Sequence, residues 1–480
     1  MKKTIIRGGK VVDGLGGPSY RADIRIEGDR ITAIGEIDRD DDADVVDASG
    51  RIVCPGLIDV HTHDDMAVIN SPDMLAKISQ GVTTVIVGNC GVSLAPYQGK
   101  EPATPPLSLF RDPQAYRYAT VSDWRQAVES ASPSVNVAKL IGHAILRHKA
   151  MDQLDRPASE AEIEVMRQEL ETALSEGAIG LSTGLAYPAA RDATEQEVTA
   201  IASIMATTGG VYCTHLRNER ERVVESVSEA LRTAANAEVP LVISHHKCMG
   251  RTNHGLITKT LQMIDASPDE VALDVYPYLA SSTALDPSRV KDADRILISY
   301  STPHPEVIGR DLTDIAAEWG MSPIEVAEQL MPGSAIYFEM SEDDLKRVMR
   351  NPRTMFGSDG ISSDSHPHPR LWGTFPRVLG RYVRDQGLLG LEEAIHRMTK
   401  LSADNFGIIN RGVIRIGAYA DLMVFDADTI IDHADFQTPT RPAAGVEAVF
   451  VNGVLSYLPS QGCINHAGRV LTDRRRKPTY

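Results

Sequence analysis

The stretch with the clearest chemical potential is GLIDVHTHDD, residues 56–65, where two histidines follow an apolar run. The segment RIVCPGLIDV is rich in Ile, Val and Leu and predicts a β-strand. Alternate side chains of a strand share a face, so we expect His61 and His63 to hold one metal ion. Spacing alone is weak evidence, because 14 histidines in 480 residues give about 0.4 such pairs by chance. The second pair, His366 and His368, stands among prolines that argue against a regular strand.

The central part of the chain alternates strand-like and helix-like segments that would position these residues. The strand-like segments are GLIDVHTH, VTTVIVGNCG, VNVAKLIGHA, AIGLSTGL, GGVYCTHLRNE, PLVISHHK, VALDVYPY and RTMFGSDG. Helical patterns separate several of them, such as SEAEIEVMRQELETALSEG and RVVESVSEALRTAANAE. This alternation predicts an α/β fold, a (β/α)8 barrel of the TIM type, whose active sites lie at the C-terminal ends of the strands. Those ends carry His61, His63, Cys90, His143, His215, His245 and Asp359.

These residue types favour a metal centre. Zinc prefers imidazole and thiolate ligands, and Cys90 ends a strand and is flanked by Asn and Gly, so its sulfur can face a cavity. A cysteine that stood alone would more often be a small buried hydrophobe. His246 should point away from the face of His245, because neighbouring side chains alternate. Asp359 can contact the metal and accept a proton from water, although an aspartate beside glycine is also a common turn residue.

Both ends of the chain are β-rich. Residues 1–50 form short apolar runs joined by Gly and Asp, and Asn452-Gly453 between two apolar runs predicts a hairpin turn. We therefore predict a small β domain from residues 1–56 and 410–480, and a metal-dependent barrel over residues 57–409.

One connection is much longer than the others. About 75 residues separate the expected strands seven and eight, against about 30 for an ordinary βα unit. The segment contains a proline-bearing loop and two helical patterns, LTDIAAEWG and SPIEVAEQLM. We predict that residues 280–350 form a lid or specificity element, and the alternative is a helical excursion without a role in the site.

Composition excludes several classes of function. The 49 basic and 65 acidic residues give a net charge of −16, which disfavours nucleic acid and anionic membranes as partners. No apolar run is long enough to span a bilayer, and MKKTIIRGGK lacks the apolar segment of a signal peptide. Five widely spaced cysteines imply no disulfide framework. We expect a cytoplasmic protein with reduced thiols and leave its oligomeric state open.

Taken together, PGLIDVHTH and GSDG resemble motifs of the amidohydrolase superfamily. Within it, GNCG, GLAYPAA, THLRNE, ISHHK and GSDG are similar to motifs of the N-acyl-D-amino-acid deacylases, also called D-aminoacylases. This resemblance implies zinc-dependent hydrolysis of N-acyl-D-amino acids to a carboxylate and a free D-amino acid. It also implies a tight Zn²⁺ site and a weaker second one. The tight site would consist of Cys90, His215 and His245, and the weaker one of His61 and His63 beside Cys90 and Asp359.

The small-molecule substrate implied by this family carries an α-carboxylate, which needs cations or hydroxyl groups. Lys247 follows His245, Tyr278 ends the expected strand seven, and Arg377 lies beyond strand eight. We predict that these three bind the carboxylate, although such side chains are more often solvated or packed. His143 either lines the site or has a structural role.

Arg295 in the long connection raises the question of the preferred side chain. If the connection folds over the site, Arg295 would meet a second carboxylate, and the preferred substrate would be an N-acyl-D-glutamate or D-aspartate. The alternative is that Arg295 pairs with Asp292 or Asp294.

Two other functions stay open from the sequence. A cyclic-amide hydrolase of the hydantoinase or dihydroorotase type would use the same barrel. Enzymes of that type typically bridge two metals with a lysine on strand four, and AIGLSTGLAYP contains none. A non-catalytic binding protein that keeps the barrel is disfavoured by the complete set of candidate ligands.

Overall fold

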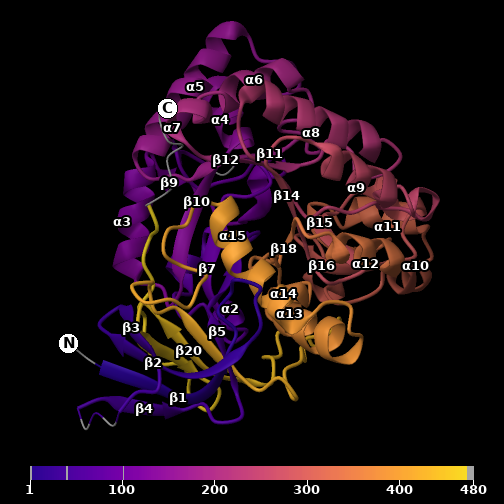
Figure 1. The fold of residues 1–480 in the computed structure, drawn as a ribbon. Coiled ribbons are helices and arrows are strands. Elements are labelled where there is room, and N and C mark those ends of the chain that lie inside the picture. The colour runs from indigo at the N-terminus through magenta and orange to yellow at the C-terminus, as the bar shows by residue number, and fades with distance from the viewer. Residues whose placement is uncertain (1–2, 39, 41, 101, 473–480) are drawn as a thin grey trace.

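A closed barrel of eight parallel strands forms the main body of the protein (Figure 1). The computed structural model describes residues 3–38, 40, 42–100 and 102–472. The barrel strands are β6 (Leu57–Asp59), β7 (Val82–Val87), β10 (Asn136–Gly142), β11 (Gly180–Gly184), β12 (Val211–His215), β13 (Leu241–Ile243), β14 (Val271–Val275) and β18 (Thr354–Phe356). Each pairs with the next, and a parallel bridge between Thr62 and Gly360 closes the ring. The predicted barrel is confirmed, and each predicted segment contributes one strand.

Helices surround this barrel (Figure 1). The α-helices outside the long connection are α1 (Ala67–Asn70), α2 (Leu75–Ile78), α3 (Val121–Ala131), α4 (His143–Ala150), α5 (Glu160–Ser175), α6 (Glu195–Ala202), α7 (Met205–Thr208), α8 (Val223–Ala237), α9 (Ile257–Ala266), α13 (Arg370–Arg377), α14 (Leu391–Met398) and α15 (Lys400–Asn405). A capping box between Ser159 and Glu162 begins α5, which satisfies free backbone N–H groups there. None of the helices in the described ranges combines the length and apolar composition needed to cross a membrane.

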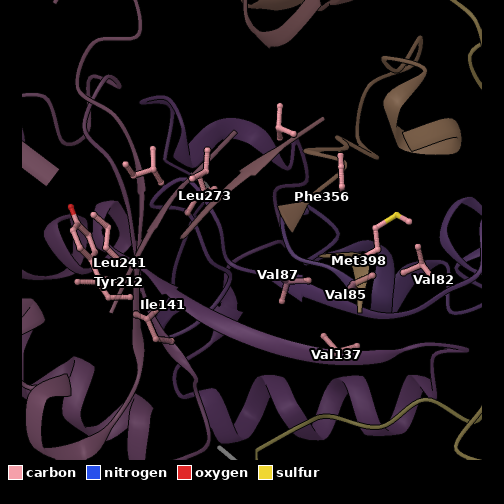
Figure 2. Packing of buried hydrophobic residues seen from close by; sticks show 14 of the residues in the cluster. Val82, Val85, Val87, Val137, Ile141, Tyr212, Leu241, Leu273, Phe356 and Met398 are labelled. Carbon is pink, nitrogen blue, oxygen red and sulfur yellow. The ribbon is translucent and has the colours of Figure 1, made fainter. Parts of the chain in front are cut away.

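Alternating side chains of the strands build two separate cores. Val85, Leu273 and Phe356 belong to the cluster between strands and helices, part of which Figure 2 shows. Their neighbours Ile86 and Ala272 belong to the cluster that fills the barrel. Because every second residue faces inward, a side chain one step beyond a strand can be aimed at the mouth of the barrel.

A second sheet is built from both ends of the chain, as predicted. Its N-terminal strands are β1 (Lys3–Val11), β2 (Tyr20–Glu27), β3 (Arg30–Gly35), β4 (Asp44–Asp47) and β5 (Ile52–Pro55). Its C-terminal strands are β19 (Leu422–Phe425), β20 (Val446–Val451), β21 (Val454–Leu458) and β22 (Gly462–Cys463). The antiparallel pairing of β19 with β5 joins the two sets. Asn452 and Gly453 both have positive φ in the turn between β20 and β21, as expected of a tight hairpin.

The single strand predicted for RIVCPGLIDV is wrong, because the run divides at Gly56 between two sheets. β5 belongs to the terminal sheet and β6 to the barrel. A Cβ at Gly56 would lie 2.2 Å from the side chain of Thr83, so only glycine fits where the chain crosses between the sheets. The domain boundaries predicted near residues 56 and 410 stay predictions.

The long connection contains a sheet that the sequence analysis did not predict. Strands β15 (Ala280–Ala284), β16 (Arg295–Ser301) and β17 (Gly333–Phe338) form an antiparallel sheet in the order β15-β17-β16. The two predicted helices are present as α10 (Leu312–Trp319) and α11 (Pro323–Gln329), and α12 (Glu342–Arg350) follows β17. Pairing between strands far apart in sequence gives no local signal, which explains the omission.

A buried polar network joins the terminal sheet to the barrel. Arg411 forms an ion pair with Asp421 and donates to Asn452 Oδ1 at 2.7 Å. Asn452 in turn donates to Oδ1 of Asn136 at 2.8 Å, and Asn136 is the first residue of β10. All four side chains are at most 4% exposed, so each depends on its partners for hydrogen bonding.

We predict that Asp421→Ala lowers the free energy of unfolding by about 3–5 kcal/mol, because it leaves the buried Arg411 charge without its carboxylate. Urea-induced unfolding followed by circular dichroism measures the change. The control is Asp29→Ala, which removes partly exposed ion pairs with Arg469 and Arg30 and should cost about 0–1 kcal/mol. Equal losses in the two variants would contradict the role assigned to the network.

Candidate metal centre

Three imidazoles surround one buried thiol at the mouth of the barrel. Cys90 Sγ lies 3.3 Å from His61 Nε2, 3.4 Å from His245 Nε2 and 3.7 Å from His215 Nδ1. These residues follow or end β6, β7, β12 and β13, so four strands contribute to one point. The structure therefore brings together the side chains predicted for the tight site, and places His61 beside them.

A carboxylate and a fourth imidazole complete the cluster. Asp359 Oδ1 lies 3.2 Å from His63 Nε2 and 3.5 Å from His61 Nε2. Ligand atoms of His61, Cys90, His245 and Asp359 all lie within 4.8 Å of one another. His246 points away from the cluster and contacts Thr260 Oγ1 at 2.9 Å, so it faces away from His245 as predicted.

Three of these residues have an unusual backbone conformation. Cys90, His245 and Asp359 have φ of 53°, 35° and 49°, in the left-handed region that non-glycine residues rarely adopt. Such a conformation costs about 1–3 kcal/mol per residue and persists only where the surroundings enforce it. The strain falls on the residues that converge at the barrel mouth, which is typical of functional sites.

Carboxylates outside the cluster hold its imidazoles in place. Asp274 Oδ2 lies 3.3 Å from His61 Nδ1, and Asp274 Oδ1 accepts a hydrogen bond from the backbone N–H of His245 at 2.9 Å. Glu219 Oε1 lies 3.1 Å from His245 Nδ1, and its other oxygen lies 3.6 Å from His215 Nε2. A carboxylate on one ring nitrogen keeps the proton there and leaves the other nitrogen free for a metal.

The cluster also favours ionised ligands. Burial opposes ionisation of the Cys90 thiol, but His61 and His245 outweigh burial and hold the pKa of Cys90 well below its usual range. Burial likewise opposes the charge of Asp359, yet Arg370 and His245 keep the pKa of this carboxyl well below its usual range. A thiolate and an ionised carboxylate are the forms that bind a divalent cation.

This donor set fits zinc. One thiolate, several imidazoles and a carboxylate are the ligand types that Zn²⁺ combines, and a softer or harder ion would favour a more uniform set. The Nδ1 atoms of His61 and His245 face the carboxylates of Asp274 and Glu219, which leaves their Nε2 atoms free to bind the ion. Cys90, His61, His63, His215, His245 and Asp359 are the residues that would hold it.

Comparison with known proteins agrees with this geometry. The model of the amidohydrolase family matches residues 44–274 and 307–457. A D-aminoacylase of Alcaligenes xylosoxydans xylosoxydans is 46% identical over 469 residues, which cover 97% of each chain. The chain belongs to the D-aminoacylase family of amidohydrolases. It is therefore a member of a family of metal-dependent amidohydrolases.

Two solved structures in this family are close to the present one. A D-aminoacylase structure, from work on a binuclear metal centre with one-metal activation and second-metal attenuation, superposes with a TM-score of 0.95 at 46% identity. It covers 98% of this chain and 99% of its own. The N-acyl-D-glutamate deacylase of Bordetella bronchiseptica, complexed with zinc and a phosphonate mimic of the tetrahedral intermediate, has a TM-score of 0.94 at 44% identity. Here the coverage is 98% of this chain and 100% of the other.

A buried lysine ties the first and last barrel strands together beneath the metal centre. Lys77 donates to Asp59 Oδ2 at 2.8 Å and to Ser358 Oγ at 2.7 Å, and lies 3.3 Å from Asp64 Oδ2. Asp59 also accepts the backbone N–H of Ser358 at 2.8 Å. These bonds link the segment bearing the paired histidines to the residue before Asp359. Sequence reasoning missed Lys77, which lies in an ordinary amphipathic segment.

The residues predicted to bind substrate are distributed unevenly. Lys247 lies beside the cluster, with Nζ 2.8 Å from both Glu219 Oε1 and His245 Nδ1. Arg377 instead pairs with Asp432 at 2.9 Å and stacks over the ring of Tyr278. The Tyr278 hydroxyl also points to Asp432, at 3.4 Å. Arg377 and Tyr278 thus form a unit of their own.

Two further predicted residues are engaged away from the cluster. Arg295 makes two hydrogen bonds to Asp311, at 2.7 and 3.0 Å, and pairs with neither of the aspartates considered from the sequence. His143 Nε2 lies 3.0 Å from Glu197 Oε1, and Glu197 also pairs with the buried Arg147. This arrangement favours the structural alternative for His143.

The most informative residue that sequence reasoning missed is Arg370, at the start of α13. Its guanidinium is fully buried, lies 2.9 Å from Asp359 Oδ2 and stacks over the ring of Tyr276. Among the described residues, its Nε and Nη1 atoms have no hydrogen-bond partner. Buried guanidinium N–H groups without partners are costly, so they point to a ligand that completes them. The sequence signal that could have found Arg370 is its position soon after GSDG, but Arg377 follows the same motif and the sequence does not separate the two.

We predict that Asp274→Asn weakens zinc binding about 10–100-fold. The new amide N–H₂ would face the proton on His61 Nδ1 and favour the wrong tautomer for a ligand. Zinc titration against a chromophoric chelator gives the affinity. Asp265→Asn serves as the control, because Asp265 contacts Asn351 rather than the cluster. Unchanged affinity in Asp274→Asn would show that this carboxylate does not direct His61.

Proposed function

We propose that this protein hydrolyses the amide bond of N-acyl-D-amino acids, with zinc held by the Cys90-centred cluster. The observation that carries the proposal is the position of Asp359. This ionised carboxylate contacts His61 and His63 on one side and the buried guanidinium of Arg370 on the other. A proton acceptor, a metal-ligand set and an unsatisfied cation therefore converge at one barrel mouth, as hydrolysis of an anionic amide substrate requires.

The roles of the side chains follow from this arrangement. When bound, zinc supplies a Lewis acid that polarises the amide carbonyl and makes water more acidic. Asp359 accepts the proton of the attacking water on a carboxylate oxygen and later donates it to the leaving amine nitrogen. Tyr187 packs against His215 with ring centroids 4.8 Å apart, and burial raises the pKa of its phenol, so it stays protonated and can donate a hydrogen bond to the substrate.

Arg370 and Lys247 are suited to bind the α-carboxylate. Both cations lie against the ring of Tyr276, at 4.4 and 5.7 Å from its centroid, which places them in the same part of the barrel mouth. The free N–H groups of Arg370, on Nε and Nη1, can each donate a charge-assisted hydrogen bond to a ligand carboxylate. This assignment replaces Arg377 as the main carboxylate-binding arginine, since Arg370 keeps two N–H groups without partners among the described residues, whereas Arg377 donates to Pro277 O and Asp432.

The preferred side chain of the substrate is best described as neutral. The predicted preference for N-acyl-D-glutamate depends on Arg295, whose guanidinium is 44% exposed and already neutralised by Asp311. The half-buried Arg289 of the same connection pairs with Glu339. An acidic substrate side chain would have to displace one of these carboxylates, at a cost in binding free energy. The similarity to both a D-aminoacylase and an N-acyl-D-glutamate deacylase, at 46% and 44% identity, does not favour either preference.

We predict amine release from D but not L enantiomers in a panel of N-acetyl Leu, Met, Phe, Glu and Asp, assayed with zinc-loaded protein. Leu, Met and Phe should react faster than Glu and Asp, and Arg295→Ala should leave this order unchanged because Arg295 is engaged by Asp311. Release from L forms only, or from none, would contradict the proposed function. If N-acetyl-D-glutamate were the fastest substrate of the parent protein but not of Arg295→Ala, the preference for acidic substrates predicted from the sequence would be supported instead.

We predict that Arg370→Met raises KM for the best D substrate about 10–100-fold, because charge-assisted hydrogen bonds of about 1.5–3 kcal/mol are lost. A substrate in which the α-carboxylate is replaced by an amide should be equally poor for parent and variant. Arg377→Met is the matched control, since this guanidinium meets Asp432 instead, and its KM should change little. The assignment fails if Arg377→Met raises KM more than Arg370→Met does.

A further inference from the structure

A second group of metal-type ligands lies outside the active site. Asp73 Oδ1 is 2.7 Å from His466 Nε2, and Cys463 Sγ lies within 4.8 Å of both ligand atoms. This trio shares no residue with the catalytic cluster. Its side chains are accessible, since His466 is 33% and Asp73 68% exposed and Cys463 is half-buried.

The three side chains come from segments that are nearly 400 residues apart in sequence. Asp73 lies between α1 and α2 on the barrel, and its carbonyl oxygen accepts a hydrogen bond from Ser134 Oγ at 2.7 Å. Cys463 ends β22 of the terminal sheet, and His466 follows three residues later. The chain then runs back along the barrel, where the N–H of Gly468 donates to Pro133 O at 2.9 Å. Both backbones are therefore held by other contacts, which keeps the trio preorganised.

We propose that Asp73, Cys463 and His466 bind one Zn²⁺, which clamps the C-terminal segment to the barrel. The ligand types combine a thiol, an imidazole and a carboxylate, all of which zinc accepts, and water can occupy a fourth position. A thiolate and a carboxylate together carry two negative charges and so neutralise the ion. The hard cations Ca²⁺ and Mg²⁺ prefer all-oxygen sites and do not fit this set.

The proposal explains why a thiol stands beside an existing His466–Asp73 ion pair. The contact between His466 and Asp73 does not involve the Cys463 thiol, and an exposed pair of this kind contributes little to stability. A metal ion would add two bonds from the C-terminal segment to one from the barrel, closing a loop of nearly 400 residues. The clamp is structural, and it does not depend on the proposed function of the active site.

Thiol reactivity tests the proposal on the full chain. All five cysteines lie in the described part of the chain, and Cys463 is the one that is not buried. A thiol reagent should therefore modify one cysteine quickly, and Cys463→Ser should remove this fast phase. The protein is first stripped of metal with a chelator, which is then removed. Added Zn²⁺ should slow the fast phase at least about tenfold, because a metal-bound thiolate no longer reacts freely. Mg²⁺ should not slow it.

The histidine variants decide between a metal site and simple shielding. His466→Asn should abolish the protection by zinc. The matched control is His304→Asn, because His304 also pairs with a carboxylate, Glu306 at 2.9 Å, and is also 33% exposed, so it should leave protection intact. Elemental analysis at saturating zinc should show one equivalent fewer in Cys463→Ser than in the parent. Zinc that leaves the rate unchanged, or protection that survives His466→Asn, would overturn the proposal.

Discussion

The structure depends above all on keeping a thiolate charged inside the protein. A buried thiol is normally neutral, and the cost of burying its charge is offset here by imidazoles on several sides of Cys90. Those imidazoles must in turn keep the correct nitrogen free, which requires the carboxylates of Asp274 and Glu219. Each layer of polar groups thus requires the next, until Lys247 balances Glu219. The barrel is the scaffold that can deliver so many side chains to one point.

This convergence has a cost in backbone energy. Left-handed conformations at Cys90, His245 and Asp359 each cost about 1–3 kcal/mol, yet they aim the three side chains at one another. The surrounding framework holds them in place. Lys77 bonds the first strand to the last, and the outer core in Figure 2 fixes the strands that lead into the site. The dense packing of the strands therefore enforces the strained backbone conformations at the mouth of the barrel.

The arginines around the site differ in which carboxylate balances their charge. Arg377, Arg289 and Arg295 each have a carboxylate partner that is no part of the metal cluster. Arg370 differs, because its carboxylate is Asp359 itself and two of its nitrogens have no partner among the described residues. Arg370 and Arg377 both follow Asp359 within 18 residues, so their positions in the sequence do not show which of them meets its carboxylate. The distinction lies in what each guanidinium meets in the folded chain.

The sequence by itself determined the order of elements and the candidates for the metal ligands. Local apolar patterns predicted all eight barrel strands and the helices α10 and α11, because such patterns reflect which face of an element is buried. The Asn-Gly pair between two apolar runs predicted the turn at residues 452–453. The tertiary structure decided how these pieces meet. Val242 faces the barrel interior, so strict alternation along the strand would direct His246 inward. The left-handed backbone at His245 breaks this alternation, and His245 points inward instead of His246. The division at Gly56, the sheet of the long connection and the Asp311 partner of Arg295 all arise from contacts between segments distant in sequence, and such contacts leave no mark on local patterns.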